Sequence, residues 1–422
     1  MRIRTGILIS LLLLTGSVSV FGQGYLSFRN EMDNILENKS RFTFGPFRLY
    51  PLIRLTDFGY DGNVYRQQED RDPITDFTVT LSPSLDVNVL YRNWLILSLT
   101  ESPEYIHYFK VSRERAWNNT LSTQVKMLMF QRIVIEGAYS NGKRRRRGTT
   151  EFDVRADEKS EELTARLFYE TPRRSMLGLS YSVRKISWDD IDLLQESVSL
   201  SNQLNRTEQD AVFEFYYKLF SQTDLFVNFG FSRYLFSEAG ADWRNSMAYE
   251  VNAGLRFPIL GRMRGTLFLG YKELMPNQKD LSGFAGIVGG STLDWRVGRF
   301  AFGLGYSRDS RFSYSQNNVF FITDHYQPGV SFYASRTFKL TYNFSYGINR
   351  YPEPEPIILN NGTVDLIKRR DVYLTHTVGF AVRVIGRTGI GMSLSWWQVD
   401  SNFYLRGARS QLFIGAYLTQ DF

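Results

Sequence analysis

The sequence predicts an all-β protein, an antiparallel transmembrane β-barrel of about 18 strands. Three observations predict this fold. Apolar and polar residues alternate along most of the chain, the connections between segments alternate between short and long, and aromatic residues gather near the segment ends. Aromatic residues make up 15% of the chain although its mean hydropathy is −0.27, and this combination suits a barrel with an apolar outer face and a polar lumen.

The alternation has a period of two residues. Phe338, Leu340 and Tyr342, for example, alternate with Lys339 and Thr341. Such a pattern places one set of side chains on each face of a strand. A soluble β-sandwich alternates too, but its strands are typically about 5 or 6 residues long. The segments here run to roughly 10 to 14 residues, which is near the length that a tilted membrane strand needs.

The connections predict the orientation of the barrel. Tight turns such as Tyr91-Arg92-Asn93 follow the even-numbered segments. Long polar connections are expected at Tyr60 to Pro73, Ser140 to Ser160, Ile186 to Glu208 and Asn349 to Arg370. Outer-membrane barrels place their short turns in the periplasm, so an even strand number leaves both chain ends there. A barrel of roughly 16 strands is the alternative, if Asp153 to Glu170 or Asn318 to Ala334 pairs differently.

Aromatic residues fall where the two membrane interfaces would lie, because aromatic rings favour the headgroup level. On the outward parity near the loop end, these residues are Tyr139, Tyr181, Phe231, Tyr271, Tyr306 and Tyr346. Near the turn end, they are Tyr169, Phe257, Phe300, Phe332 and Phe338. In a soluble protein we would expect the aromatic residues to gather in the middle of the strands instead.

The N-terminus predicts a cleaved signal peptide over residues 1–22. Arg2 and Arg4 precede a short apolar stretch from Ile7 to Leu14, and Val20-Phe21-Gly22 offers a cleavage site. The apolar stretch is too short to cross a membrane as a helix. We therefore expect an exported protein, integral to a bacterial outer membrane.

Two further parts are expected, a periplasmic N-terminal segment over residues 23–45 and the barrel over residues 46–422. In the N-terminal segment, Phe28, Met32, Ile35 and Leu36 recur at helical spacing. A short amphipathic helix over Ser27 to Asn38 would fold into the lumen as a plug or rest at the periplasmic rim. A loosely ordered tail is the alternative.

The last strand keeps apolar residues on alternate positions up to Phe422. A terminal Phe in that phase resembles the signal that the barrel-assembly machinery recognises, and we expect that machinery as a partner. Gln420 departs from the signal, because an aromatic residue is common at its position.

Residues for catalysis are few. The chain has no cysteine and only three histidines, and it contains none of the serine-hydrolase, zinc-protease or phosphate-loop motifs. We therefore expect no enzymatic activity, no cofactor and no metal. His376 has the outward parity, so a hydrolase like the outer-membrane phospholipases is an alternative. A histidine packed at the membrane interface is the favoured interpretation.

Charged residues concentrate on the parity that would face the lumen, since charge that faces lipid costs about 2 to 4 kcal/mol at the midplane. The lumen-lining candidates are Arg48, Arg54, Asp86, Lys126, Glu136, Glu162, Arg166, Arg184, Glu214, Lys218, Glu250, Arg256, Arg264, Lys339 and Arg383. Their excess of bases would favour anionic solutes in an open pore. Alternatively, opposite charges such as Glu214 and Lys218 pair across neighbouring strands without selecting any solute.

A run of bases, Lys143-Arg144-Arg145-Arg146-Arg147, falls in one of the expected extracellular loops. Basic clusters attract anionic groups, so this run would contact anionic glycan or the phosphates of lipopolysaccharide. A solvated loop tip is the alternative. Outer-membrane lipid and lipopolysaccharide are therefore expected partners, whereas nucleic acid is not expected for an exported membrane protein.

One stretch resembles a known family. Gly45-Pro46-Phe47-Arg48-Leu49-Tyr50-Pro51, then Gly59-Tyr60-Asp61-Gly62-Asn63-Val64-Tyr65, then Asp76-Phe77-Thr78-Val79 is similar to the N-terminal signature of the putative β-barrel porin 2 family. The resemblance implies a single-chain outer-membrane barrel, and some members are encoded with exopolysaccharide export systems. Asp, Gly and Asn also suit a sharp exit from the first strand, so the motif has a structural explanation without any ligand.

The sequence thus indicates an outer-membrane channel, with a conduit for polysaccharide export as the leading hypothesis and periplasmic export components as partners. A general or anion-preferring diffusion porin is one alternative. A structural or assembly barrel with a blocked lumen is the other.

Overall fold

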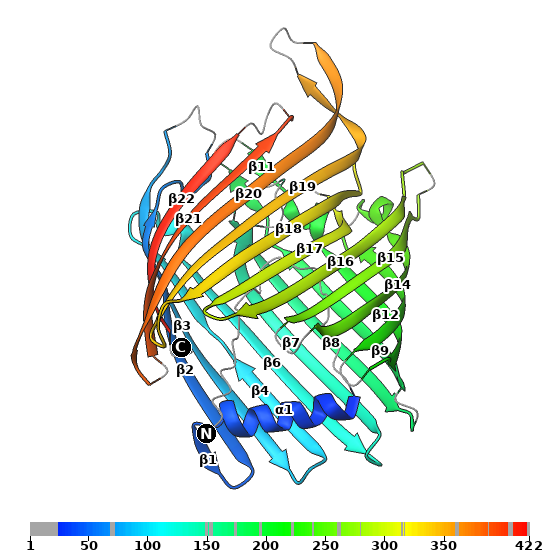
Figure 1. Cartoon of the computed structure of the whole chain (residues 1–422). Helices are drawn as coiled ribbons and strands as arrows, with labels where there is room; N and C mark the ends of the chain where they lie inside the picture. Colours follow the sequence, from blue (N-terminus) through cyan, green and yellow to red (C-terminus); the bar gives the residue numbers. More distant parts are fainter. Residues whose placement is uncertain are drawn as a thin grey trace.

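The structure is a computed structural model and describes residues 24–67, 72–147, 151, 155–172, 175–193, 196–220, 223–238, 240–259, 263–278, 280–313, 315, 317–358, 363–386, 388–403 and 408–419. The expected signal peptide over residues 1–22, Gln420 and the terminal Phe422 lie outside the described residues. One antiparallel sheet curls into a tilted barrel, with a single long helix across one of its ends (Figure 1).

The elements follow one another along the chain as listed here. The helices are α1 (Gly24–Asn38), η1 (Ser112–Glu114), α2 (Leu200–Leu204) and η2 (Asp242–Arg244). The strands are β1 (Phe42–Phe44), β2 (Phe47–Asp61), β3 (Asp76–Tyr91), β4 (Leu95–Glu101), β5 (Glu104–Tyr108), β6 (Ala116–Met129), β7 (Ile133–Arg147), β8 (Arg155–Glu170), β9 (Ser175–Trp188), β10 (Ile191–Leu193), β11 (Glu196–Val198), β12 (Arg206–Lys218), β13 (Asp224–Phe236), β14 (Ser246–Ile259), β15 (Met263–Pro276), β16 (Phe284–Val297), β17 (Phe300–Phe312), β18 (Phe320–Tyr333), β19 (Phe338–Ile358), β20 (Val364–Ile385), β21 (Thr388–Ser401) and β22 (Arg409–Thr419).

The barrel is closed and has 18 strands, which confirms the predicted fold class. β4 and β5 pair with the same two neighbours, β3 and β6, and so form one interrupted barrel strand. β1 is a short addition that pairs with the start of β2. The two segments that left room for a smaller barrel are the full strands β8 and β18, so the 16-stranded alternative is wrong.

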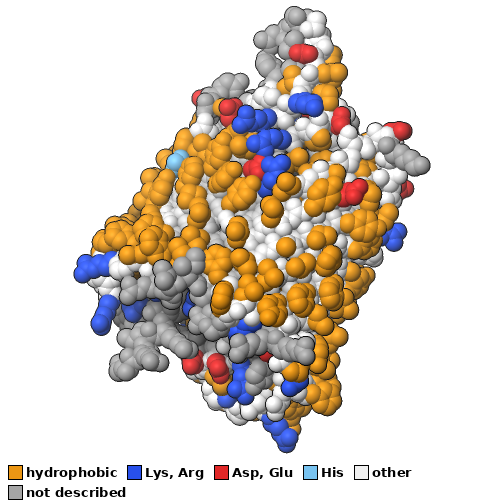
Figure 2. Space-filling view, turned by 45° about the vertical axis from the view of Figure 1, so that its right-hand side comes forward, with side chains coloured by type: hydrophobic (Ala, Val, Ile, Leu, Met, Phe, Trp, Pro, Cys, Tyr) orange, Lys and Arg blue, Asp and Glu red, His pale blue; other side chains and the backbone are white. Residues whose placement is uncertain are grey.

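Burial alternates along the strands as the sequence predicted. On β3, Phe77 is 57% exposed on the outer face, whereas the next residue, Thr78, is 3% exposed on the inner face. Apolar side chains cover the outer face as a belt (Figure 2). None of the helices in the described ranges is both long enough and apolar enough to cross a membrane.

The seam that closes the barrel joins β2 to β22. A Cβ atom at Gly59 would lie 1.9 Å from the carbonyl oxygen of Ile414, so only glycine allows the two strands to approach this closely. At the loop end of the seam, the Gln411 Nε2 atom donates to Asp61 Oδ1 at 2.7 Å, and the backbone N–H of Gly62 donates to the Leu412 carbonyl at 2.8 Å. Residues Gly59 to Gly62, part of the stretch that resembles the porin family, therefore join the first barrel strand to the last.

Two of the expected long loops are largely strand. β7 continues to Arg147 and β8 begins at Arg155, inside the predicted loop from Ser140 to Ser160. Likewise β19 continues to Ile358 and β20 begins at Val364, which makes a hairpin that rises above the rest of the barrel (Figure 1). The prolines of this hairpin suggested a loop. They lie beyond the last β18 partner of β19, which is Ile322 opposite Arg350, so β19 pairs there with β20 alone, and the register with β20 shifts between Arg350 and Pro354. Edge positions and bulges of this kind are where strands tolerate proline.

Candidate functional site

The candidate site is the lumen, whose turn end is partly covered by α1. The helix lies against the inner face of β6, β7 and β8. Its Phe28 and Ile35 are 1% and 2% exposed. They pack on inward-facing apolar residues near the tight turns, namely Leu90, Ile96, Val134, Phe168, Met176, Tyr216 and Phe226. Burying a large apolar side chain contributes about 1.5 to 3 kcal/mol, so this contact stabilises the docked position of the helix.

The sequence carries a signal for this docking surface. Near the turns the alternation breaks into runs of three apolar residues, for example Ile133-Val134-Ile135 and Leu167-Phe168-Tyr169. The middle residue of each run faces the lumen, where an aqueous channel would favour a polar side chain. Such runs indicate an inner wall that is covered by an apolar partner, which here is α1.

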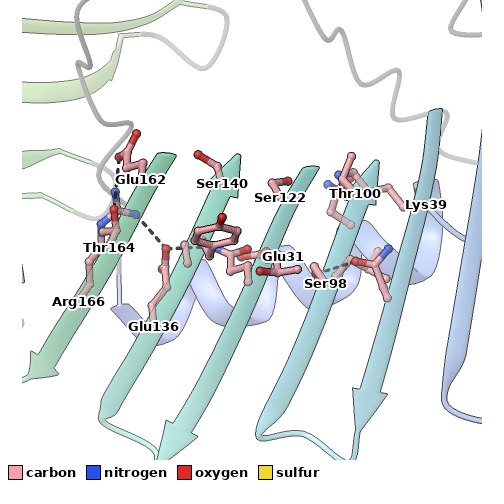
Figure 3. Close-up of a pocket in the computed structure, with 17 residues that line it drawn as sticks. Glu31, Lys39, Ser98, Thr100, Ser122, Glu136, Ser140, Glu162, Thr164 and Arg166 are labelled. Atoms are coloured by element: carbon pink, nitrogen blue, oxygen red, sulfur yellow. Dashed lines mark hydrogen bonds and ion pairs between the residues drawn. The ribbon is translucent and has the colours of Figure 1, made fainter. Parts of the chain in front are cut away.

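Charged side chains tie α1 to the same wall. Lys126 of β6 forms ion pairs with Glu31 of α1 and with Glu136 of β7, the second at 3.4 Å. Glu136 also pairs with Arg166 of β8, at 2.9 Å from Oε1 to Nη1. Figure 3 shows Glu136 and Arg166 on neighbouring strands with Glu31 beside them. Three of these four residues are predicted lumen-lining candidates, and the structure brings them together with a helix residue that the prediction did not include.

A polar pocket of about 480 Å³ lies between α1 and the inner faces of β3, β4, β6, β7 and β8. Hydroxyl groups line much of it, including those of Ser98, Ser122 and Thr164 (Figure 3). At its edge, Lys39 Nζ lies 3.7 Å from Asp86 Oδ2, with the Lys39 side chain still 41% exposed. The pocket therefore offers hydrogen-bond donors and acceptors of several kinds to a hydrated solute.

Higher in the lumen, bases and acids are partly paired. Arg184 lies opposite Glu162 in the register and 3.9 Å from Glu208. Glu250 lies opposite Lys272, which pairs with Asp309 of β17 at 2.7 Å. The prediction included Glu162, Arg184 and Glu250 but not Glu208, Lys272 or Asp309.

The suggested pair between Glu214 and Lys218 is wrong. Both residues lie on β12, and four residues along one strand span about 13 Å. Glu214 instead accepts a hydrogen bond from Tyr216 Oη at 3.1 Å, and Arg256 lies over the Tyr216 ring.

The remaining candidates are spread along the inner wall and do not form one cluster. Arg48 donates to the Gly45 and Phe47 carbonyls. The other four are identified by the residue opposite in the register: Ser82 for Arg54, Asp224 for Lys218, Asp294 for Arg264 and Gly389 for Arg383.

The wall opposite the α1 docking surface is basic at its turn end. Lys339 of β19 and Arg296 of β16 both lie over the ring of Tyr333, at 5.7 and 5.9 Å from its centroid. Among the described residues, no acidic side chain lies within ion-pairing distance of either base. Arg296 was not among the predicted residues, although it has the same parity as Asp294 on its strand.

At the loop end, the lumen is crossed by a contact between opposite sides of the barrel. Glu151, from the connection between β7 and β8, accepts a hydrogen bond from Ser313 Oγ at 2.6 Å and lies 3.9 Å from Arg369 of β20. Arg369 is 3% exposed and pairs with Asp371 at 2.6 Å and with Glu355 at 3.9 Å. One buried guanidinium thus holds three carboxylates.

Arg244 of η2 ties three further connections together. Its Nη1 atom donates to Gln203 Oε1 of α2 at 2.8 Å, and its Nη2 atom donates to the carbonyl of Ser313. Its guanidinium lies 5.0 Å from the ring centroid of Trp243. The residue is fully buried, so the connections around β12, β14 and β18 meet at a single side chain.

The basic run over Lys143–Arg147 is not an extracellular loop tip, because it forms the end of β7. Acidic residues on the neighbouring segments explain the extended hairpin. Lys143 and Arg145 pair with Asp157 at 3.8 and 3.4 Å, and Arg146 pairs with Glu158. Arg144 donates to Thr120 Oγ1 at 3.0 Å, and Arg147 donates to the Val64 carbonyl at 2.8 Å.

His376 lies on the outward face of β20 and packs among aromatic rings. Its Nδ1 atom lies 2.9 Å from Tyr342 Oη, and its ring lies 4.9 Å from that of Phe344. No contact with a serine hydroxyl is formed by this histidine in the described part of the chain. Over the same residues, no group of three or more histidine and acidic side chains could hold a metal ion.

Comparison with known proteins agrees with this architecture. The sequence profile of the family described as "Putative beta-barrel porin 2" matches residues 42–356. No curated protein sequence matches the chain.

Similar solved structures include OccK3 (OpdO) of Pseudomonas aeruginosa, with a TM-score of 0.47, 10% identity and coverage of 91% of this chain and 96% of that one. The match to OccAB3 of Acinetobacter baumannii has a TM-score of 0.48 and 9% identity, and it covers 88% of this chain and 98% of the OccAB3 chain. The outer membrane protein OpdK of Pseudomonas aeruginosa gives 0.49 with 8% identity at the same coverages.

Proposed function

This chain belongs to the putative β-barrel porin 2 family and is an integral outer-membrane β-barrel channel, and from that premise we propose that it conducts a polysaccharide out of the cell. The family and the fold point to a channel rather than to an enzyme. The proposal concerns what passes through the lumen and in which direction.

The observation that carries this proposal is the polar pocket beside α1. Saccharides present hydroxyl groups that both donate and accept hydrogen bonds. Hydroxyl and amide side chains can supply either partner, and carboxylates can accept. Ser98 of β4, Ser122 and Gln124 of β6 and Thr164 of β8 supply such groups, and Asn34 supplies one from α1. A hydrated chain that enters from the periplasm would meet this pocket first.

Recording in planar bilayers tests the proposal. We expect the full chain to conduct weakly, because α1 partly covers the turn end of the lumen and the Arg369 network crosses its loop end. We expect a variant that lacks residues 24–39 to conduct more. Neutral oligosaccharide added to the turn side of that variant should block the current in a length-dependent manner. Absence of conductance in both proteins would instead favour a structural barrel with a blocked lumen, and conductance without saccharide block would contradict the proposed solute.

A second candidate is an anion-preferring diffusion porin, and the basic wall favours it. Arg296 and Lys339 face the lumen with no acid in ion-pairing distance among the described residues, and rings of Arg and Lys select anions in pores. The same bilayers distinguish the two candidates. A reversal potential that favours chloride in a salt gradient, together with no block by oligosaccharide, would support the porin.

A further inference from the structure

A group of bases faces outward from the barrel on neighbouring strands, away from the lumen. Arg308 of β17, Arg350 of β19 and Arg370 and Lys368 of β20 make up this outer basic patch. On β17 the even-numbered residues Phe302 and Leu304 are exposed on the outer face, and Arg308 shares their parity. The register continues that face, since Arg308 lies opposite Asp324 and Arg350 lies opposite Arg370. Figure 2 shows Lys and Arg side chains gathered at the upper margin of the apolar belt.

The patch lies at the level of the outer-leaflet headgroups. Tyr306, Tyr326 and Tyr346 stand side by side on the same face, with ring centroids 4.9 and 6.1 Å apart. Aromatic rings of this kind mark the membrane interface. Arg308 follows Tyr306 by two residues and Arg350 follows Tyr346 by four, so they lie about 7 to 13 Å farther along their strands, toward the loop end.

A buried carboxylate holds two of the bases in place. Asp324 accepts hydrogen bonds from Arg308 Nη1 at 2.9 and 3.0 Å, from Arg350 Nη1, and from Tyr306 Oη at 3.1 Å. The Asp324 side chain is 5% exposed, whereas that of Arg350 is 46% exposed. Asp324 therefore holds the guanidinium groups of Arg308 and Arg350 in place, and much of the Arg350 side chain remains accessible to a ligand.

Asp324 balances only part of the positive charge of the patch. Arg350 and Arg370 lie directly opposite each other on adjacent strands, where like charges destabilise a sheet. No acid in the described part of the chain lies within ion-pairing distance of Arg370 or Lys368. Asp400 shares the face on β21 but lies opposite Val372 in the register. An anion between the two arginines would remove the repulsion.

We infer that the outer basic patch binds the phosphate groups of an anionic glycolipid of the outer leaflet. The acyl chains of such a lipid lie against the apolar belt, and its phosphates reach the guanidinium groups of Arg308, Arg350 and Arg370. Arginine binds phosphate through charge-assisted and often bidentate hydrogen bonds. The patch faces lipid rather than the lumen, so the inference is independent of the conducted solute. The basic run over Lys143–Arg147 does not serve this purpose, because acids of its own hairpin occupy it.

The test is native mass spectrometry of the full-length protein, titrated with bisphosphorylated lipid A and with its dephosphorylated form. The variant R350Q/K368Q/R370Q removes three bases and leaves Arg308 on Asp324. The control variant K185Q/R233Q removes two outward bases near the loop ends of β9 and β13. We expect the patch variant to bind the bisphosphorylated lipid about tenfold more weakly or worse, and the control to stay within about twofold of the unaltered protein.

Three results would overturn the inference. The first is equal binding by the patch variant and the unaltered protein, and the second is equal loss in the control, which would make overall charge the cause. The third is binding of inorganic phosphate as tight as that of lipid A, which would assign the patch to a free anion. Heat-dependent migration on gels establishes that each variant is folded. Among the described residues Lys368 and Arg370 form no ion pair, so the variant K368Q/R370Q keeps the test decisive if the triple variant fails to assemble.

Discussion

Different kinds of interaction partly obstruct the two ends of the lumen, and we call them the inner closure (α1 at the turn end) and the outer closure (the Arg369 network at the loop end). At the turn end, α1 rests on apolar residues such as Val134 and Phe168, with one buried base, Lys126, between it and the wall. At the loop end, Arg369 and Glu151 meet in the interior of a polar network, drawn from opposite sides of the barrel. Apolar contact is non-directional and scales with area, whereas a buried ion network depends on every member. We therefore expect α1 to move gradually away from the wall, whereas the ion pairs of the Arg369 network are expected to break together.

The largest effect is expected at the outer closure. In the variant Arg369→Met, the carboxylates of Glu151, Glu355 and Asp371 lose their shared buried partner, at a cost of up to about 5 kcal/mol. We expect a higher single-channel conductance and faster proteolysis from the loop side. The control is Arg336→Met, at an exposed position in a tight turn. Unchanged conductance and proteolysis in Arg369→Met would show that the network does not hold the closure.

A smaller effect is expected from the variant Phe28→Ala at the inner closure. Truncating this buried ring removes about 3 kcal/mol of docking, so α1 should spend more time away from the wall. Amide hydrogen exchange of α1 should accelerate, and the conductance should rise without any change at the loop end. Leu36→Ala alters an apolar residue of the same helix that is 44% exposed, and it serves as the matched control. Equal effects of the two variants would mean that α1 is not seated on the wall through Phe28.

The smallest effect is expected for Lys39→Gln, which removes the partly exposed pair with Asp86. Pairs of this kind contribute about 0.2 to 1 kcal/mol and are screened by salt. Exchange in α1 should accelerate slightly at low salt and match that of the unaltered protein at high salt. A salt-independent change of the size expected for Phe28→Ala would mean that Lys39 does more than pair with Asp86.

The barrel could be predicted from the sequence because the alternation of apolar and polar residues and the tight turns depend only on residues that are close in sequence. Alternation such as that of Phe77 and Thr78 needs only neighbouring residues, and so does the tight turn at Arg92. Loops were predicted where β7 and β19 continue, because charged residues and prolines usually mark loops. On β7, acidic residues of β8 pair with the bases. On β19, the prolines lie beyond the last β18 partner, where the strand pairs with β20 alone.

The site was only partly predictable. Lys126, Glu136 and Arg166 were expected on the lumen face, and their parity placed them there in register with one another. Glu151 and Arg369 were not expected to meet, because the contact depends on a connection that reaches the far side of the barrel. No local sequence pattern indicates how far across the lumen this connection reaches. The apolar run around Val134, in contrast, does indicate the docking surface of α1.

The seam between β2 and β22 has a consequence for the order of folding. Asp61 and Gln411 are 350 residues apart in sequence, so their hydrogen bond cannot form until nearly the whole chain has been synthesised and exported. The paired stretch is also short, since it runs from Leu55 to Asp61 on β2 and is interrupted by an irregularity. Contacts between distant residues form slowly, because the entropy of closing the loop must be overcome first. We therefore expect this seam to be the last part of the barrel to form and the first to separate when the protein unfolds.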